Sequence, residues 1–273
     1  MRNGNGKFDN NNLIHQRIST RRRSIILLVL ILGNSLLISC GKRDEKTELL
    51  VGAAASLEPA MKEVQILYEE QHPEVDLNFT FASSGTIEQQ IREGAPIGLF
   101  VSAAEKQMDA LSEDNLIITT SRMDLFKNEV VLIVPEDSKL EINNFNDITK
   151  ANIIAIGDPE SVPAGQYAKK IFEELGIWDA VYEKATLGKD VTEVSAWVSS
   201  GDADAGIVYR SDALISNSIK IAAGAPEGSS IAIYPAAVIA GTKVKNQAEE
   251  FLAFLDTKDS SDIFMKYGFG IID

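Results

Sequence analysis

The sequence predicts an α/β fold in which helices cover both faces of parallel sheets. Two observations indicate it. Short apolar runs typical of buried strands alternate with segments whose apolar residues recur every three or four positions, as on one face of a helix. The loops between them are short, which favours parallel strands connected through helices. The chain of 273 residues is long enough for two such sheets, each with its own hydrophobic core.

Strands and helices alternate in the first half of the chain. Apolar runs predict strands at residues 48–53, 75–82, 99–102 and 130–134, the last ended by Pro135. A helix is predicted from Ser56, because apolar residues follow it at helical spacing, namely Leu57, Met61, Val64 and Tyr68. The next helix passes through residues 87–91 and stops at Gly94, and a third includes residues 108–111.

The second half repeats the pattern. Its predicted strands occupy residues 153–156, 205–209 and 231–240, and a late helix includes residues 251–255. A helix over residues 167–175 stops at Gly176. Another begins at Asp190, carries valines 191, 194 and 198 on one face and ends near Gly201. Glu193 follows Asp190 at the spacing of a capping box, which predicts a structural role for the Asp190 side chain.

The first forty residues have the features of an export signal. Arginines 21–23 precede an apolar run over residues 25–38 that is too short to span a membrane comfortably. The run leads into Leu-Ile-Ser-Cys, which is similar to a bacterial lipobox, and Cys40 is the only cysteine. We therefore expect residues 1–39 to be a lipoprotein signal peptide, Cys40 to carry lipid, and residues 40–46 to tether the protein to the outer face of the cell membrane. The alternative is a plain transmembrane anchor in which Cys40 is a buried thiol.

The charge of the exported part argues against some classes of partner. The chain has 26 basic and 40 acidic residues, and six basic residues but only one acidic residue precede Cys40. The remaining 20 basic and 39 acidic residues give the exported part a formal charge of −19. Such a surface repels nucleic acid and anionic lipid headgroups. Any anion bound here must therefore be held by local donors rather than by the overall field.

The residues after Cys40 lack the parts of most catalytic and metal sites. They include a single histidine, His72, in a polar run typical of an exposed helix end. Without a second histidine or a cysteine pair, zinc ligation and Ser/His or Cys/His catalysis are incomplete. The motifs of the nucleophile elbow, the Walker loop and the dinucleotide-binding turn are also missing. We therefore expect no catalytic residue, no cofactor and no metal ion.

Three predicted loops open helices with small and hydroxyl residues, at positions 53–56, 82–86 and 162–165. The first turn of a helix has unpaired N–H donors and a partial positive charge, and small side chains let an anion approach them. The alternative is that Ser56, Ser84 and Asp190 are ordinary N-caps. On the same alternative, Tyr209 is an amphipathic residue at a strand end.

The protonation state of a bound anion depends on whether these loops also supply an acceptor. Donors alone suit a fully deprotonated dianion, whereas hydrogen phosphate needs an acceptor for its remaining proton. Glu58, Asp158 and Asp190 lie near the loops. The sequence leaves open whether one of them is that acceptor.

Five segments resemble the periplasmic molybdate-binding proteins: VGAAASLEPAM (51–61), FASSGTIEQQIREGAPIGLFVSA (81–103), IGDPESVPAGQYAKKIFEELGIW (156–178), GIVYRSDA (206–213) and KYGFG (266–270). The resemblance covers nearly all of residues 47–273. The DPESVPAG and GIVY stretches are specific to this family, whereas AAASL and ASS are shared more loosely with binders of sulfate and other oxyanions. Two positions depart from the family pattern: Gly85 stands where a serine is usual, and Gly98 where an aspartate is usual.

This resemblance implies a two-lobed type II periplasmic-binding-protein fold, each lobe a sheet flanked by helices, with a hinge between them. Residues 47–128 plus 233–273 would form lobe 1, and residues 129–232 would form lobe 2. In this family, serine hydroxyl and backbone donors of lobe 1 hold the oxyanion, and these fall here on Ser56 and Ser84. Lobe 2 would contribute backbone N–H groups at Ala164 and Val191 and the hydroxyl of Tyr209.

The function implied by the resemblance is that of a monomeric binding protein, not an enzyme. It would close on molybdate or tungstate and deliver the anion to the membrane permease of an ABC importer. One alternative is the same fold binding sulfate or another tetrahedral oxyanion. A remote alternative is a secreted serine hydrolase with Ser56 or Ser84 as nucleophile, for which the sequence offers no base.

Overall fold

The computed structural model describes residues 46–226, 228 and 231–272. Lys46–Asp273 forms one compact unit. The predicted signal peptide, Cys40 and all of the predicted tether except Lys46 lie outside the described residues. Among the residues that are described, no helix is both long and apolar enough to cross a membrane.

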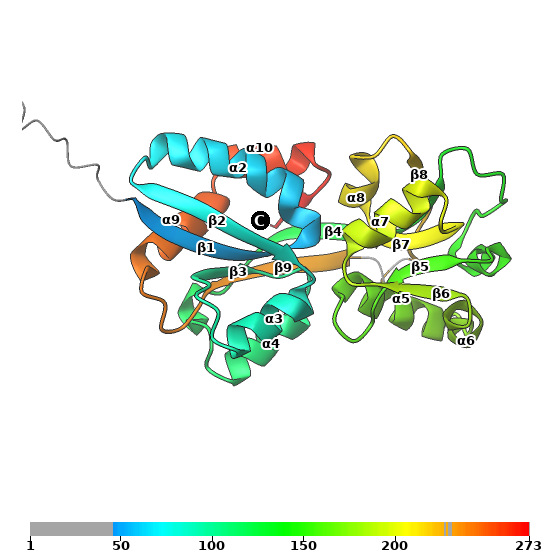
Figure 1. Cartoon of the computed structure of the whole chain (residues 1–273), viewed down its shortest axis with the longest axis horizontal. Coiled ribbons are helices and arrows are strands. Elements are labelled where there is room, and N and C mark those ends of the chain that lie inside the picture. The colour runs from blue at the N-terminus through cyan, green and yellow to red at the C-terminus, as the bar shows by residue number, and fades with distance from the viewer. Residues whose placement is uncertain (1–45, 227, 229–230, 273) are drawn as a thin grey trace, which may run out of the picture. The chain divides into compact units, whose positions relative to one another are not determined.

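Ten strands of the described chain form a continuous sheet (Figure 1). Their order is β2-β1-β3-β9-β4-β7-β5-β6, with β8 and β10 also paired to β4. In the first half, β1 (Thr47–Ala54) is parallel to β2 (Val75–Ala82) and β3 (Leu99–Val101). In the second half, β5 (Ile154–Gly157) is parallel to β6 (Ala185–Gly188) and β7 (Ala205–Tyr209). The predicted α/β class is confirmed.

Two long strands, β4 (Met123–Pro135) and β9 (Ile231–Val238), join the halves and run antiparallel to each other. β9 is also antiparallel to β3, and β4 is antiparallel to β7, to β8 (Ile219–Gly224) and to β10 (Gly270–Ile271). The sheet is therefore parallel within each half and antiparallel at its centre, because the chain leaves the first half along β4 and returns along β9 in the opposite direction.

The partner of β4 changes along its length. Residues 123–129 pair with β9, whereas residues 130–135 pair with β7 and β8. β4 also begins earlier than the apolar run predicts, because exposed and buried residues alternate before Val130. The lobe boundaries, 47–128 plus 233–273 and 129–232, remain a prediction.

Helices cover both faces of each half (Figure 1). In the first half, α2 (Glu58–Gln71), α9 (Lys245–Leu255) and α10 (Lys258–Lys266) lie on one face, and α3 (Ser84–Arg92) and α4 (Glu105–Glu113) lie on the other. In the second half, α7 (Val191–Ser200) and α8 (Arg210–Leu214) lie opposite α5 (Pro163–Glu174) and α6 (Trp178–Tyr182). Short 3-10 turns occupy Ala55–Leu57, Thr119–Ser121 and Phe145–Lys150.

The helices begin and end as their sequences require. In α2 the buried side chains are Ala60, Met61, Val64 and Tyr68, which form the apolar face that the spacing predicts. The predicted stops at Gly94, Gly176 and Gly201 have φ angles of 86°, 71° and 80°. Glycine adopts this left-handed conformation without the steric cost that a side chain brings.

Candidate functional site

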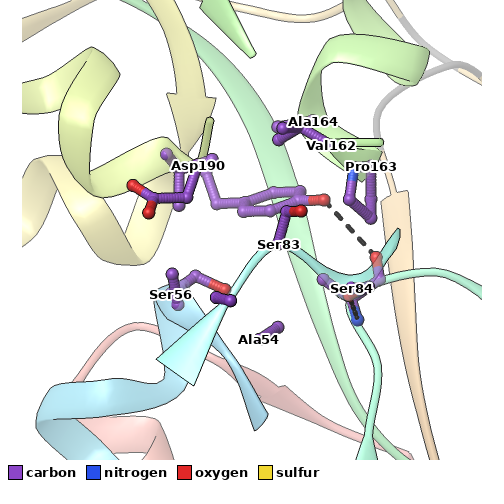
Figure 2. A pocket seen from close by; sticks show the side chains of 13 residues that line it. Ala54, Ser56, Ser83, Ser84, Val162, Pro163, Ala164 and Asp190 are labelled. Atoms are coloured by element: carbon purple, nitrogen blue, oxygen red, sulfur yellow. Dashed lines mark hydrogen bonds between the residues drawn. The ribbon is translucent and has the colours of Figure 1, made fainter. Parts of the chain in front are cut away.

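One small cavity lies where the three predicted loops meet (Figure 2). All five predicted ligand residues line it, namely Ser56, Ser84, Ala164, Val191 and Tyr209. The two serines precede β4 in the chain, and the other three residues follow it. Figure 2 shows Ser56 and Ser84 on one side of the cavity and Ala164 across from them. The structure thus brings all five together, and their role as ligands remains a prediction.

The size of the cavity limits what it can hold. The space open to the centre of a water-sized sphere is about 10 Å³, which corresponds to roughly one such sphere. A cavity of this size excludes an organic substrate. None of the described lining residues is a lysine or an arginine. An anion held here must therefore be stabilised by neutral donors.

Backbone donors reach the cavity from three helix starts. Ser84 is the first residue of α3, Ala164 the second residue of α5, and Val191 the first residue of α7. N–H groups at these positions have no acceptor within their own helix. Each helix also places the positive end of its dipole at the cavity. Three helix starts that converge on one small space can hold an anion without a cationic side chain.

Side chains other than the predicted ligands cap α3 and α7. Ser83 is the N-cap of α3, and its Oγ accepts the N–H of Thr86 at 3.2 Å. Asp190 is the N-cap of α7, and its Oδ1 accepts the N–H of Glu193 at 2.9 Å. The capping interpretation is therefore confirmed for Asp190 and wrong for Ser84. It is also wrong for Ser56, which lies inside the 3-10 turn before α2.

The two serine hydroxyls are held in place by partners that leave one proton to donate. Ser84 Oγ accepts the N–H of Ala103 at 2.9 Å, and both groups are buried. Its hydroxyl proton is then free to point into the cavity. Ser56 Oγ lies 2.9 Å from the hydroxyl of Tyr234. If Tyr234 donates in this pair, the proton of Ser56 is also directed to the cavity.

A buried network of hydrogen bonds holds the Ser56 side chain in place. Tyr234 belongs to β9, and its ring is fully buried. The side-chain amide of Asn128, on β4, donates to Tyr234 Oη at 3.5 Å and to Ser211 Oγ at 2.8 Å. This network links Ser56 to both long strands and to α8. Tyr234 and Asn128 were not predicted from the sequence. The only signal for either residue is a polar side chain within an otherwise apolar strand.

Tyr209 is positioned by a buried carboxylate. Its N–H donates to Asp212 Oδ2 at 3.0 Å, and its hydroxyl donates to the carbonyl of Ala103 at 3.4 Å. Burial raises the pKa of Tyr209 well above its usual value, so the hydroxyl stays protonated and can donate. Burial also raises the pKa of Asp212 to about 7.

Two glycines let α5 approach β5 closely enough to present Ala164. A Cβ on Gly165 would lie 2.0 Å from the carbonyl oxygen of Gly157, and a Cβ on Gly157 would lie 2.5 Å from Val162 Cγ1. Any larger residue at either position would push the start of α5 away from the sheet. The N–H of Val162 donates to the carbonyl of Asp158 at 2.7 Å and closes the loop that precedes the helix.

Of the three acidic residues considered as proton acceptors, Asp190 alone lines the cavity among the described residues. Glu58 pairs with Lys62 on the surface of α2. Asp158 Oδ1 accepts the N–H of Glu160 at 3.0 Å within its own loop. Asp190 Oδ1 is engaged in capping α7. The arrangement therefore offers many donors and a single carboxylate, which caps α7 through one of its two oxygens, and this balance favours a fully deprotonated dianion.

The described residues hold no base that could activate Ser56 or Ser84. His72 caps the C-terminal end of α2, stacks on Tyr68 with ring centroids 4.3 Å apart and does not line the cavity. No group of three His, Cys, Asp or Glu that could hold a metal ion occurs in the part of the chain that the structure describes. A serine hydrolase mechanism lacks its general base here.

Gly98, the position at which the resemblance predicts an aspartate, packs closely against neighbouring residues. A Cβ at this position would lie 2.6 Å from Leu49 Cδ1 and 3.3 Å from Thr242 Oγ1. A side chain at this position would therefore require the Leu49 Cδ1 methyl to move. The backbone of Gly98 bonds to Leu50 and Ile239, so the loop is held without a carboxylate.

Comparison with known proteins agrees with this geometry. Residues 49–270 match the family described as bacterial extracellular solute-binding protein, and the chain belongs to that family. It is 36% identical over 247 residues to the "Putative ABC transporter substrate-binding lipoprotein YvgL" of Bacillus subtilis, covering 90% of this chain and 95% of the relative. It is 36% identical over 231 residues to the "Molybdate-binding protein ModA" of Haemophilus influenzae, covering 81% and 89%.

A solved structure is also similar. It is the "substrate binding domain of putative molybdenum ABC transporter from Clostridium difficile", which is 38% identical with a TM-score of 0.65 and covers 84% of this chain and 100% of that one. The fold is that of the type II periplasmic binding proteins. The family and these relatives are binding proteins rather than enzymes, so the serine hydrolase alternative is wrong.

Proposed function

We propose that this protein captures molybdate or tungstate outside the cytoplasm and delivers it to the membrane permease of an ABC importer. The observation that carries the proposal is the small cavity in which backbone N–H groups and hydroxyls from both halves of the sheet converge without a cation. A tetrahedral dianion matches the many donors and the scarcity of carboxylates around the cavity. Relatives named as molybdate-binding proteins support the choice of anion.

In this proposal the hydroxyls of Ser56, Ser84 and Tyr209 and the N–H groups of Ala164 and Val191 hold the anion. Tyr209 has a single hydroxyl proton, which it gives to the carbonyl of Ala103 in this structure, so that proton turns to the anion on binding. The serines come from the predicted lobe 1, and the other three residues come from the predicted lobe 2. Because the ligand bonds to both lobes only when they approach each other, binding shifts an open–closed equilibrium towards the closed form. Sulfate has the same charge and shape, so discrimination would depend on the size of the closed cavity.

We further propose that Cys40 carries a lipid that keeps the monomeric protein at the outer face of the cell membrane. The relative named as a substrate-binding lipoprotein supports this proposal. Mass spectrometry of the protein isolated from membranes should find residues 1–39 removed and a lipid on Cys40. An unmodified Cys40 behind an uncleaved N-terminal segment would instead support a plain transmembrane anchor. Light scattering of residues 41–273 should give the mass of one chain.

The ligand is tested by calorimetry on residues 41–273, which include the compact unit Lys46–Asp273. Molybdate, tungstate, sulfate and phosphate are titrated in turn. Tight binding of molybdate and tungstate alone is the expected result. A response to sulfate or phosphate alone would keep the oxyanion site and refute the choice of anion. No response to any of the four would refute the proposed function.

A further inference from the structure

Two glutamine side chains meet where the halves of the sheet approach each other beside the cavity. The side-chain amide of Gln107, on α4, donates through Nε2 to Gln166 Oε1, on α5, at 3.5 Å. Both helices lie below the strands in Figure 1, α4 in the first half and α5 in the second. Gln107 follows the cavity residue Ala103 by four positions, and Gln166 follows the proposed ligand Ala164 by two. The pair therefore lies next to the cavity, although neither glutamine lines it.

Each of these amides has a second polar atom that remains unbonded. Gln107 Oε1 and Gln166 Nε2 are buried, and neither has a hydrogen-bond partner among the described residues. Only 2% of Gln107 is exposed. A buried polar atom without a partner costs free energy, so such atoms are rare in folded proteins. One of these two atoms is an acceptor and the other is a donor, so each is a suitable partner for the other.

The two amides can bond to each other twice. When two amide groups lie edge to edge, the nitrogen of each donates to the oxygen of the other. The existing bond already joins one nitrogen to one oxygen, and at 3.5 Å it is longer than the usual N–H···O distance of about 2.9–3.0 Å. A small further approach of α4 and α5 would shorten this bond and bring Gln166 Nε2 to Gln107 Oε1.

Neighbouring contacts connect this pair to the closure of the cavity. The N–H of Gly85, on α3, donates to the carbonyl of Ser161, before α5, at 3.0 Å. These contacts join the two halves and must separate when the halves move apart. In such an open form, water satisfies both amides. In the closed form the amides are buried, so they bond to each other or stay unpaired.

We infer that the Gln107–Gln166 pair raises anion affinity by holding the two halves of the closed form together. The inference rests on the proposed function for the identity of the anion. Both glutamines are positioning residues, because neither lines the cavity that would hold the anion. A protein whose binding-competent form is less populated binds its ligand more weakly in the same proportion.

The test is a double-mutant cycle in residues 41–273 with Gln107→Met, Gln166→Met and the double variant. Methionine is unbranched like glutamine and has no donor. Each single variant leaves the other amide buried without a partner in the closed form, so molybdate should bind at least about fivefold more weakly by calorimetry. The double variant replaces both partners by apolar groups and should recover most of the affinity. Gln71→Met, at the exposed end of α2, is the matched control and should bind like the parent.

The pattern of these affinities decides the inference. Single variants that bind molybdate like the parent would overturn it. A double variant whose loss of affinity is the product of the two single losses would also overturn it, because the two side chains would then act independently. Thermal unfolding is measured on each variant, since a purely structural role would lower the melting temperature and leave the affinity unchanged.

A second readout needs no ligand. Spin labels on Glu113→Cys in α4 and Lys170→Cys in α5, both exposed positions, report the separation of the halves by pulsed electron resonance. If the parent binds none of the four anions, the proposed function fails, and these distances then decide whether the pair holds the halves together. Longer distances in the single methionine variants than in the parent and the double variant would support the inference, and equal distances in all four proteins would overturn it.

Discussion

Replacing Val191 by proline removes one N–H donor from the proposed anion site and leaves the helix that it begins intact. Val191 is the first residue of α7, where proline is well tolerated because its missing N–H has no partner within the helix. The preceding residue, Asp190, has φ −161° and ψ 173°, an extended conformation of the kind that proline favours before it. Asp190 can therefore continue to cap the helix through Glu193.

The magnitude follows from the kind of bond that is lost. A hydrogen bond to a charged group contributes about 1.5–3 kcal/mol. The Kd for molybdate should therefore rise by roughly 10- to 150-fold. Val191→Ala is the matched control, because it shortens the same buried side chain and keeps the N–H. Calorimetry on both variants separates the donor from the packing, and thermal unfolding shows whether α7 is retained.

The comparison can refute the assignment of Val191 as a ligand. If Val191→Pro and Val191→Ala bind molybdate equally well, the N–H at this position does not contact the anion. If both bind more weakly by the same factor, the packing of the valine side chain accounts for the effect. Loss of binding in the proline variant alone is the predicted result.

Three further predictions concern groups around the cavity. Ser84→Ala removes a donor and should weaken molybdate binding by roughly tenfold or more, measured by calorimetry. It also leaves the buried N–H of Ala103 unpaired and should lower the free energy of unfolding by about 1–3 kcal/mol, measured by urea unfolding. Parental affinity would contradict the role of Ser84 as a ligand. Tyr234→Phe should weaken binding by about two- to tenfold, because Ser56 loses the partner that orients it, whereas Tyr182→Phe on the surface should bind like the parent. Asp212 has a pKa raised to about 7 by burial, so the folded protein keeps a proton that the unfolded chain releases, and stability should fall as pH rises from about 4 to 7. In Asp212→Asn, the decrease in the free energy of unfolding between pH 4 and pH 8 should be smaller by up to roughly 4 kcal/mol, as measured by urea unfolding. The exposed control Asp137→Asn should show the same decrease as the parent. An equal decrease in the parent and in Asp212→Asn would contradict the burial argument.

Local sequence signals predicted much of the fold. Apolar runs located β1, β2, β5 and β7 to within a residue or two at each end, and glycine stops located the ends of α3, α5 and α7. The direction of β4 and β9 could not be predicted in this way, because strand pairing depends on partners far along the chain. Most residues of β6 and β8 are exposed or half-buried, so these strands lack a continuous apolar run, and β10 and α8 have too few residues for a pattern to show.

The candidate site was likewise predicted only in those features that have a local sequence signal. The helix openings with small residues identified the loops that line the cavity, because unpaired N–H groups are a property of any helix start. The sequence could not show whether Ser83 or Ser84 caps α3, because the answer depends on a one-residue difference in where the helix begins. The support of Ser56 by Tyr234 joins residues 178 positions apart and has no local signal. The contact between Gly85 and Ser161 depends likewise on how the two halves meet.

The most direct test of the central claim is a crystal structure of residues 41–273 grown with tungstate and measured at a tungsten absorption edge. The account predicts one strong anomalous peak in the cavity, within hydrogen-bond distance of the donors of Ser56, Ser84, Ala164, Val191 and Tyr209. A peak elsewhere on the protein, or an empty cavity under conditions in which calorimetry shows binding, would contradict it.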